Sequence, residues 1–350
     1  MRNLNSMFSF LALAILMNTL MGCMDHSTMT NPALNINYPA SYVVNGGSNT
    51  ISVIKIADNS VAATITLNGA MFPHHIYLNP AKTKLAVAIT STDLSAGHGA
   101  HTGATAGFKI QIIDAITGTI DKEIALTKMP HNAIFNKTGS ELWVGQTDDV
   151  QSKVIIYSTA DWSVKNTVNV GKGLSEITFS PDGNTAFACN TTDNTVSYID
   201  AANKSIHHTL LVGKAPIGAW PSGNGNMYVD NETDQTISEI SIAEMDIKST
   251  IKLGFMPGYV AYSDHHGELW VTDATNGKVV YYSKTAGVWT LKGGIPTDKN
   301  AHAIAFVADN KTALVTNQDA GNVSIIDIES HKLTKNIMVG TKPNGIALKE

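Results

Sequence analysis

A short sequence motif that recurs about every forty residues is the feature that most constrains the fold of this chain. Each copy is a short apolar run, and the seven copies lie at residues 42–45, 85–88, 142–145, 187–190, 228–231, 270–273 and 314–317. With residues 43, 87, 144, 188, 229, 271 and 315 as anchors, successive copies are 44, 57, 44, 41, 42 and 44 residues apart. A period near forty residues is typical of propellers and solenoids.

The residues that follow each anchor distinguish these two architectures. A second run alternates apolar and polar residues, as at 194–200 and 322–327, and a third run follows, as at 335–339. A turn with Gly or Pro then opens a fourth run, such as 343–348, and no segment has the periodicity of an amphipathic helix. Four strands per repeat in an all-β chain predict a seven-bladed β-propeller with four-stranded antiparallel blades.

The order of strands along the chain predicts how the ring closes. If the strands of a blade are called A to D outward from the axis, the repeats begin at strand B, near Tyr42, and end at strand A, residues 346–349. We therefore expect the C-terminal strand A to pair with the N-terminal strands B to D, which removes two open sheet edges.

The sequence motifs of the repeat are also recognisable. Tyr-Val-x-Asn, then Asn-Thr-Val-Ser-x-Ile-Asp, then Val-Gly-Lys-x-Pro resembles the YVTN-repeat β-propellers, a family of largely bacterial and archaeal secreted or surface proteins. The resemblance covers nearly all of residues 40–350. It implies the propeller fold and says little about function, because the quoted residues shape strands and turns.

The first residues predict export. Arg2 precedes an apolar run at 7–21, which is shorter than the ~20 residues that span a bilayer and is typical of a signal peptide. The run ends in Leu-Met-Gly-Cys, which resembles the lipobox of bacterial lipoproteins and implies cleavage before Cys23 and its diacylation. A plain signal peptide with a chance cysteine is the alternative. Acylation of Cys23 would leave Cys189 without a partner, so no intrachain disulfide is expected.

Three segments follow from this interpretation. Residues 1–22 are a lipoprotein signal peptide, 23–39 a lipidated N-terminus and flexible tether, and 40–350 the propeller. The residue after Cys23 is Met24, not aspartate, and under the sorting rule of enteric bacteria this implies a lipid anchor in the outer membrane, with the protein facing the periplasm or the cell surface.

Charge excludes one class of partner. The chain has 24 basic and 29 acidic residues, a net charge of −5, and Arg2 is its single arginine. Nucleic-acid binders need a basic patch, and bidentate phosphate clamps favour arginine, so no nucleic-acid partner is expected.

Histidines recur at one repeat position. The residues that follow the start of strand A in the seven repeats are, in chain order, His74, His131, Ser175, Ile217, Gly258, His302 and Asn344. The three histidines belong to blades 2, 3 and 7, with Asn344 on blade 1 between them. Because a propeller axis collects one position from every blade, we expect them to form one arc at the channel mouth.

The long interval between repeats adds two more imidazoles. Residues 91–107 form a Gly-rich insertion between strands B and C of blade 2, which contains His98 and His101. The B-to-C and D-to-A connections emerge on the same face of a four-stranded blade, so the insertion is expected over the same mouth. A Gly-rich loop with few large apolar residues favours flexibility or ligand capture over packing.

Five imidazoles could supply the three or four nitrogen ligands of a transition metal, at about 2.0 to 2.1 Å. Met71, Met129 and Met256 stand near the starts of three A strands. Thioether with imidazole favours copper, whereas imidazole alone suits zinc equally. The competing interpretation is that the family carries Pro-His-Gly here only as a turn-to-strand junction.

Three weaker candidates come one place later in the repeat. His75 is expected to point away from His74, because neighbouring side chains alternate along a strand. Glu176 and Tyr259 could face the channel and serve in ligand contact or acid–base work.

The sequence thus predicts a periplasmic or surface lipoprotein that binds copper or zinc at the propeller mouth. Its partners would be a metal ion or small ligand there and the membrane through its lipid anchor only, and we expect a monomer. A metal-free scaffold that presents loops to a protein partner is the alternative, followed by an oxidoreductase or hydrolase that uses the same mouth. No nucleophile elbow, Walker loop, Rossmann fingerprint or Cys-x-x-Cys-His motif occurs, so catalytic residues stay unassigned and a binding role is favoured over an enzyme.

Overall fold

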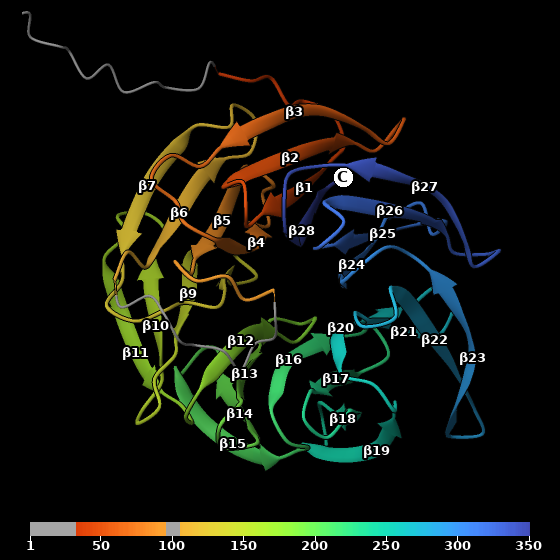
Figure 1. The fold of residues 1–350 in the computed structure, drawn as a ribbon. Helices are drawn as coiled ribbons and strands as arrows, with labels where there is room; N and C mark the ends of the chain where they lie inside the picture. The colour runs from red at the N-terminus through yellow and green to blue at the C-terminus, as the bar shows by residue number, and fades with distance from the viewer. Residues whose placement is uncertain (1–32, 96–105) are drawn as a thin grey trace, which may run out of the picture. The chain divides into compact units, whose positions relative to one another are not determined.

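Twenty-eight strands and no helix make up the part of the chain that the computed structural model describes, residues 33–95 and 106–350. They form seven four-stranded sheets that surround a common centre (Figure 1). The predicted seven-bladed propeller is confirmed. The predictions made for Cys23, His98 and His101 concern residues outside the described part.

Each blade has one strand at the axis and three that follow it outward. Blade 1 contains, in that order, β28 (Pro343–Lys349), β1 (Ala40–Asn45), β2 (Thr50–Lys55) and β3 (Ser60–Thr66). Blade 2 contains β4 (Pro73–Leu78), β5 (Lys84–Ile89), β6 (Lys109–Asp114) and β7 (Ile120–Ala125). Blade 3 contains β8 (Ala133–Phe135), β9 (Glu141–Gln146), β10 (Lys153–Ser158) and β11 (Val164–Asn169). Blade 4 contains β12 (Leu174–Phe179), β13 (Thr185–Asn190), β14 (Thr195–Asp200) and β15 (Ser205–Leu211).

The other three blades repeat the same order. Blade 5 contains β16 (Pro216–Pro221), β17 (Asn226–Asn231), β18 (Thr236–Ser241) and β19 (Asp246–Lys252). Blade 6 contains β20 (Pro257–Ser263), β21 (Glu268–Asp273), β22 (Lys278–Thr285) and β23 (Val288–Pro296). Blade 7 contains β24 (Ala301–Phe306), β25 (Thr312–Asn317), β26 (Asn322–Asp327) and β27 (Lys332–Met338).

The last strand of the chain closes the ring as predicted. β28 pairs antiparallel with β1, with Tyr42 opposite Ala347 and Ala40 opposite Lys349. The innermost strands of neighbouring blades contact one another around the whole circle, including β28 with β4 and with β24. Both ends of the repeat array therefore share one sheet.

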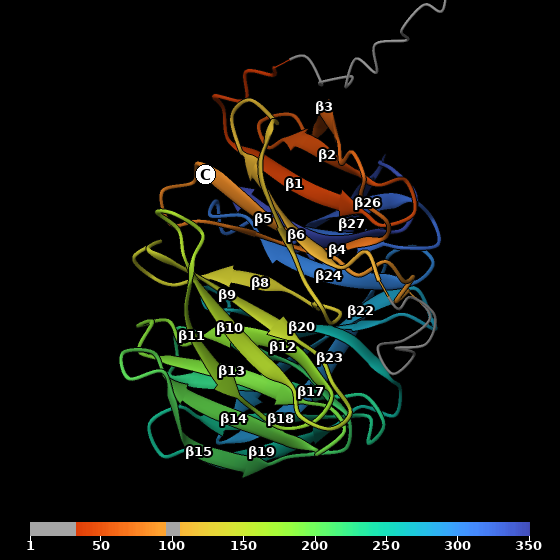
Figure 2. The same ribbon diagram turned by 90° about the vertical axis from the view of Figure 1, so that its left-hand side faces the viewer.

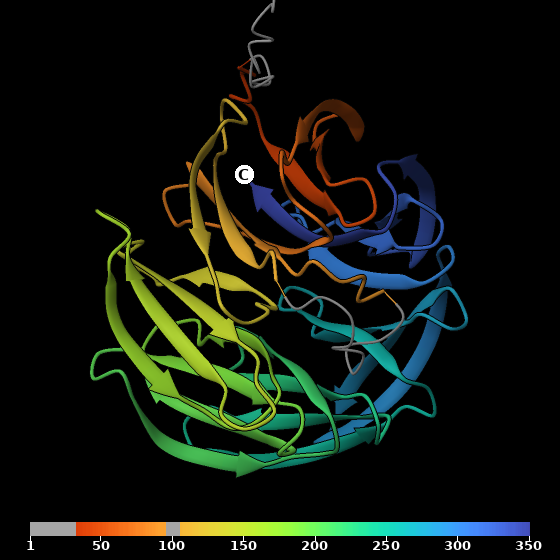
Figure 3. The same cartoon turned by 60° about the vertical axis from the view of Figure 1, so that its left-hand side comes forward.

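Burial explains why the inner strands do not alternate cleanly between apolar and polar residues. All six residues of β1 are buried, and so are the central four of β14, because each blade packs between two others (Figure 3). Most of the outermost strands have a single buried residue near their end, such as Ile65 in β3 and Val168 in β11, and β15 has none. Strands covered on both faces read as continuous apolar runs.

The asparagine that ends the repeated motif has a structural role. The Asn45 side chain donates to the hydroxyls of Thr50 and Ser52, both at 3.0 Å. Asn190 repeats this with Thr195 at 3.0 Å and Ser197 at 2.9 Å. The amide thus binds strand B of its own blade to strand C, and it satisfies polar groups inside a buried sheet.

The connections divide between the two faces of the disc, which Figure 2 shows from the side. A-to-B turns lie on one face, and B-to-C and D-to-A connections lie on the other. No helix in the described part of the chain is long and apolar enough to cross a membrane.

Candidate metal centre

In six of the seven blades, a bulge near the start of the A strand determines what faces the axis. In blade 2, Pro73 pairs with Ile89 but Ile76 pairs with Val87, so two residues of β4 stand opposite one residue of β5. The same shift occurs in blades 1, 4, 5, 6 and 7. A β-bulge re-aims the side chains of the bulged strand. Two successive residues can therefore approach the axis instead of one.

Three histidines gather at this place. His74, His75 and His131 are each buried and can offer one nitrogen apiece, all within 4.8 Å of one another. The His74 ring centroid lies 4.3 Å from that of His75 and 4.6 Å from that of His131. The expectation that His75 would point to the opposite face of the strand is wrong, because the bulge interrupts the alternation on which it relied.

Glu176 is the carboxylate of the cluster. Its Oε1 lies 2.7 Å from His75 Nε2 and 3.4 Å from His131 Nδ1. Its Oε2 accepts from the Tyr77 hydroxyl and from Asn132 Nδ2, both at 3.0 Å. Burial alone would raise the pKa of Glu176, but the neighbouring His75 and His131 outweigh burial and hold the pKa well below its usual range. The ionised carboxylate of Glu176 therefore holds His75 and His131 together.

His302 lies beside the three histidines but not among them. Its ring centroid is 6.1 Å from that of His74 and 6.0 Å from that of His75. The expected arc of His74, His131 and His302 is thus corrected, since the observed group replaces His302 with His75. The reason is the width of the ring, which separates blade 7 from blade 3. Asn344 stands between, with its amide nitrogen 2.6 Å from His74 Nδ1.

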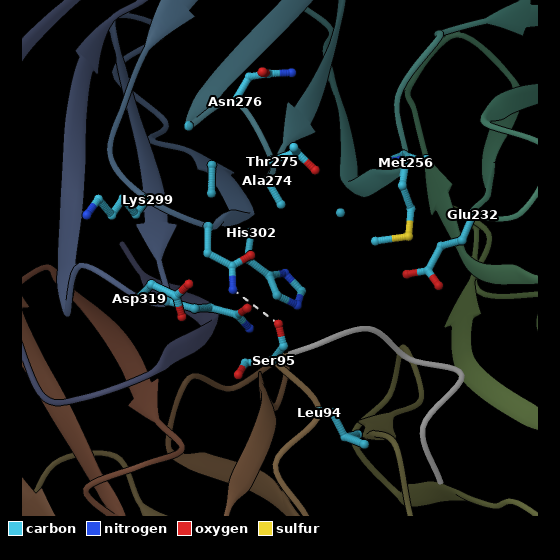
Figure 4. Close-up of a pocket in the computed structure, with 16 residues that line it drawn as sticks. Leu94, Ser95, Glu232, Met256, Ala274, Thr275, Asn276, Lys299, His302 and Asp319 are labelled. Atoms are coloured by element: carbon cyan, nitrogen blue, oxygen red, sulfur yellow. Dashed lines mark hydrogen bonds between the residues drawn. The ribbon is translucent and has the colours of Figure 1, made fainter.

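The mouth of the channel is a pocket of about 620 Å³ on the face of the B-to-C and D-to-A connections. His302 points into it (Figure 4), and of the four histidines near the axis it alone lines the pocket. Asn300 Nδ2 donates to the Ser95 carbonyl at 3.1 Å, which joins blade 7 to the start of the blade-2 insertion. Glu232 and Asp319 contribute carboxylates to the wall. Lys299 also lines the pocket and Lys342 pairs with Asp319 at 2.6 Å, so the mouth carries charges of both signs.

The predicted thioethers are dispersed. Met256 lines the mouth pocket and is 40% exposed, whereas Met71 is 57% exposed. Met129 is buried. Cys189 is buried and has no disulfide partner in the described part of the chain, and burial raises its pKa well above the usual range.

Aromatic rings form the floor of the centre on the far side from the mouth. Tyr259 lies 6.3 Å from His302 and 3.9 Å from Trp220, measured between ring centroids. The Trp220 indole lies over Gly218, where a Cβ would come within 2.4 Å of it, so the ring needs glycine at that position. Burial, and to a smaller extent Glu176, raises the pKa of Tyr259 well above its usual range. The cluster therefore lies in a low-dielectric part of the molecule.

Two contributors were missed from the sequence. Asn132 occupies the repeat position of His75 and Glu176, and Tyr77 lies two residues further along β4 than His75. Aligning the repeats one position beyond the histidine would have found Asn132, because His75 and Glu176 occupy the same position of their repeats. No sequence signal singled out Tyr77.

The fold and this cluster define the chain as a seven-bladed β-propeller with a histidine–carboxylate centre on its axis. No protein-family model matches it, and no curated protein does. Among solved structures it is similar to the periplasmic gluconolactonase of Pseudomonas aeruginosa, at 17% identity and a TM-score of 0.72, over 89% of this chain and 99% of that one.

Two further solved structures share the fold. Hydrazine synthase of Kuenenia stuttgartiensis is 17% identical, with a TM-score of 0.66 over 79% of this chain and 89% of that one. A functionally unknown protein of Desulfotomaculum acetoxidans is 12% identical, with a TM-score of 0.71 over 88% and 98% of the two chains. At such identities the likeness shows the fold alone.

Proposed function

We propose that this chain binds one transition-metal ion, copper or zinc, through His74, His75 and His131. The observation that carries the proposal is the approach of three buried imidazoles to within 4.8 Å of one another. Nitrogens bound to one tetrahedral ion at 2.0 to 2.1 Å are about 3.4 Å apart, so small side-chain rotations would complete the site. Imidazole is a good ligand for both metals, so the three histidines suit either ion.

The groups around the histidines support coordination. The contact of Glu176 with His75 Nε2 leaves Nδ1 of His75 as the nitrogen that would bind the ion. A metal-bound histidine usually donates its other N–H to a carboxylate or carbonyl, which raises its basicity as a ligand. Asn344 can do the same for His74.

The orientation of the Asn344 amide bears on His74. Its buried Oδ1 has no hydrogen-bond partner among the described residues, while Nδ2 lies against His74 Nδ1. The two ends of an amide are assigned from their surroundings, and the reverse orientation would let Oδ1 accept from His74 Nδ1–H. His74 would then coordinate through Nε2.

Metal content of the purified protein tests the proposal. Wild type loaded with copper or zinc and dialysed is expected to keep about one ion per chain by elemental analysis, because three ligands converge on one place. The variant His74→Ala/His75→Ala/His131→Ala is expected to lose it. The matched control is His265→Ala/His266→Ala, which also removes adjacent histidines but on the face of the A-to-B turns.

Absence of metal above background in wild type would end the proposal and leave the metal-free scaffold that presents loops to a protein partner. Circular dichroism checks that the triple variant folds. If it does not, titration of the single variant His75→Gln gives the answer, since it keeps the volume of the side chain and removes one ligand nitrogen.

A second candidate is an enzyme that uses the metal. The pocket of about 620 Å³ lined by His302 favours it, because a catalytic metal needs room for a small molecule nearby and the His302 ring centroid lies 6.1 Å from that of His74. An exchangeable water on the bound metal, detected by relaxation measurements, supports this candidate, and a coordinatively closed ion argues for storage or transfer.

We propose that the chain works as a monomeric lipoprotein of the YVTN-repeat family, anchored through Cys23 to the outer membrane and facing the periplasm or the cell surface. The support is the lipobox-like end of the N-terminal apolar run. A labelled fatty acid should enter wild type but not Cys23→Ala, and Cys23→Ala should leave the membrane fraction. Labelling of both proteins would contradict the assignment.

A further inference from the structure

A second cavity lies at the other end of the axis. It measures about 400 Å³, within the usual range of about 300–1,000 Å³ for small-molecule sites, and opens on the face that carries the A-to-B turns. Tyr77, Trp220 and Tyr259 line it, so the aromatic floor of the metal centre is the inner wall of this cavity. The wall between the two is one layer of side chains.

Three polar groups of this inner wall form hydrogen bonds within the protein. The Tyr77 hydroxyl donates to Glu176 at 3.0 Å, and Trp220 Nε1 donates to buried Asp230 at 3.1 Å. The Thr178 hydroxyl donates to the Ala219 carbonyl. With these hydrogen bonds made, the wall presents ring faces and methyl groups to a ligand.

Further aliphatic and aromatic groups extend the apolar surface. Ile134, Phe135 and Phe179 line the cavity between blades 3 and 4. Ring faces and branched side chains together favour a flat apolar or aromatic body, since aromatic pairs prefer offset-stacked or edge-to-face contact.

One lysine supplies the charge at the rim. Lys137 is the single Lys, Arg, Asp or Glu among the lining residues that the structure describes. Its ammonium donates to the Asp182 carbonyl at 3.0 Å. An ammonium carries three donors. The rim therefore holds an ammonium with donors to spare above an apolar floor, and the Asp182 carboxylate lies near enough to interact with its charge.

We propose that this cavity is a binding site for a small aromatic anion, such as an aryl carboxylate, whose ring lies against Tyr77, Trp220 and Tyr259 and whose acid group meets Lys137. The charge complementarity selects an anion over a neutral or cationic ligand, and the floor selects an apolar body over a sugar. The site is separate from the metal centre and does not depend on it.

Paired probes test the charge. We expect 4-nitrobenzoate to bind about three- to tenfold more tightly than neutral 4-nitrobenzamide in calorimetric titrations, because a charge-assisted hydrogen bond is roughly twice as strong as a neutral one. Lys137→Gln is expected to remove this preference. Lys335→Gln is the matched control, since Lys335 also donates to a backbone carbonyl, that of Asp58, but lies outside the cavity.

Quenching of tryptophan fluorescence tests whether the probe binds in this cavity. The nitro group quenches indole emission at contact, so the saturable part of the quenching should vanish in Trp220→Phe and persist in Trp162→Phe. Binding should also persist in His74→Ala/His75→Ala/His131→Ala, which separates this site from the metal.

Three results would overturn the proposal. These are no saturable binding of 4-nitrobenzoate at millimolar concentration, an unchanged preference in Lys137→Gln, and loss of binding in the triple histidine variant. Lys137 is on the surface, so its variant keeps the test decisive even if Trp220→Phe fails to fold.

Discussion

The two halves of the inner ring use the same backbone for opposite purposes. At the two positions after the start of strand A, blades 2, 3 and 4 carry ligand-type and polar side chains, namely His74, His75, His131, Asn132, Ser175 and Glu176. Blades 5, 6, 7 and 1 carry, in turn, Ile217, Gly218, Gly258, Tyr259, His302, Ala303, Asn344 and Gly345. One half concentrates imidazole and carboxylate, and the other is mostly small or apolar.

The difference shows that the backbone geometry of these positions and the chemistry of their side chains are encoded separately. The bulge that turns these residues inward is present in both halves, so it belongs to the repeat and not to the histidines. The half formed by blades 5, 6, 7 and 1 is nevertheless needed for the cluster. A Cβ on Gly345 would lie 3.1 Å from the His75 Cα, so the absence of a side chain on β28 allows β4 to approach.

The largest expected effect comes from opening the ring. Deletion of residues 343–350 removes β28, exposes the inner edge of β1 and removes the contacts of β28 with β4 of blade 2 and with β24 of blade 7. We expect loss of the cooperative thermal transition, because a blade without its inner strand cannot complete the circle of contacts. A truncated chain with the melting temperature of the full chain would contradict the closure and, with it, the comparison of two half-rings.

The next effect distinguishes His75 from His302. Removing one of three ligands by His75→Ala is expected to weaken metal binding by a factor of about 100 or more, whereas His302→Ala, outside the group within 4.8 Å, should change it by less than about tenfold. Competition with a chromophoric chelator measures both. Equal losses would mean that the ion sits between the half-rings and not within one.

Glu176→Gln is expected to have a smaller effect on the metal. Outer-shell partners typically contribute 10–100-fold to metal affinity, and an amide keeps the shape of the side chain while losing its charge. The control is Glu268→Gln, which alters another carboxylate–histidine pair, with His331 at 2.9 Å, on the outer part of blades 6 and 7. Affinity that falls in neither variant would remove Glu176 from the centre.

In metal-free protein, acid should remove the stabilisation that the Glu176 carboxylate contributes to the fold. The pKa of Glu176 is held low by His75 and His131 in the folded state, so the unfolded state takes up a proton first as pH falls. The stabilisation is therefore complete above the ordinary pKa of about 4.3 and declines as pH drops below it. Urea midpoints should fall less between about pH 5 and pH 3 in Glu176→Gln than in wild type or the exposed-site control Glu329→Gln. Parallel profiles would contradict this.

The sequence predicted the fold more fully than the site. Every predicted start of strand A was found except that of blade 3, where β8 begins at Ala133 and not at Pro130. Periodicity carries this information because each blade repeats the same turns and strands. It could not predict that His75 joins the cluster, since a bulge is invisible to apolar alternation, nor that His302 stays apart, since ring width depends on packing between blades.

The closure through β28 also sets the order in which the protein can be completed. The inner strand of the first blade follows every other strand of the propeller in chain order, so the edge of Tyr42 and its neighbours stays uncovered until β28 has been made. Partial chains therefore present an open sheet edge that could pair with another chain. The ring can close only after all seven repeats have been synthesised.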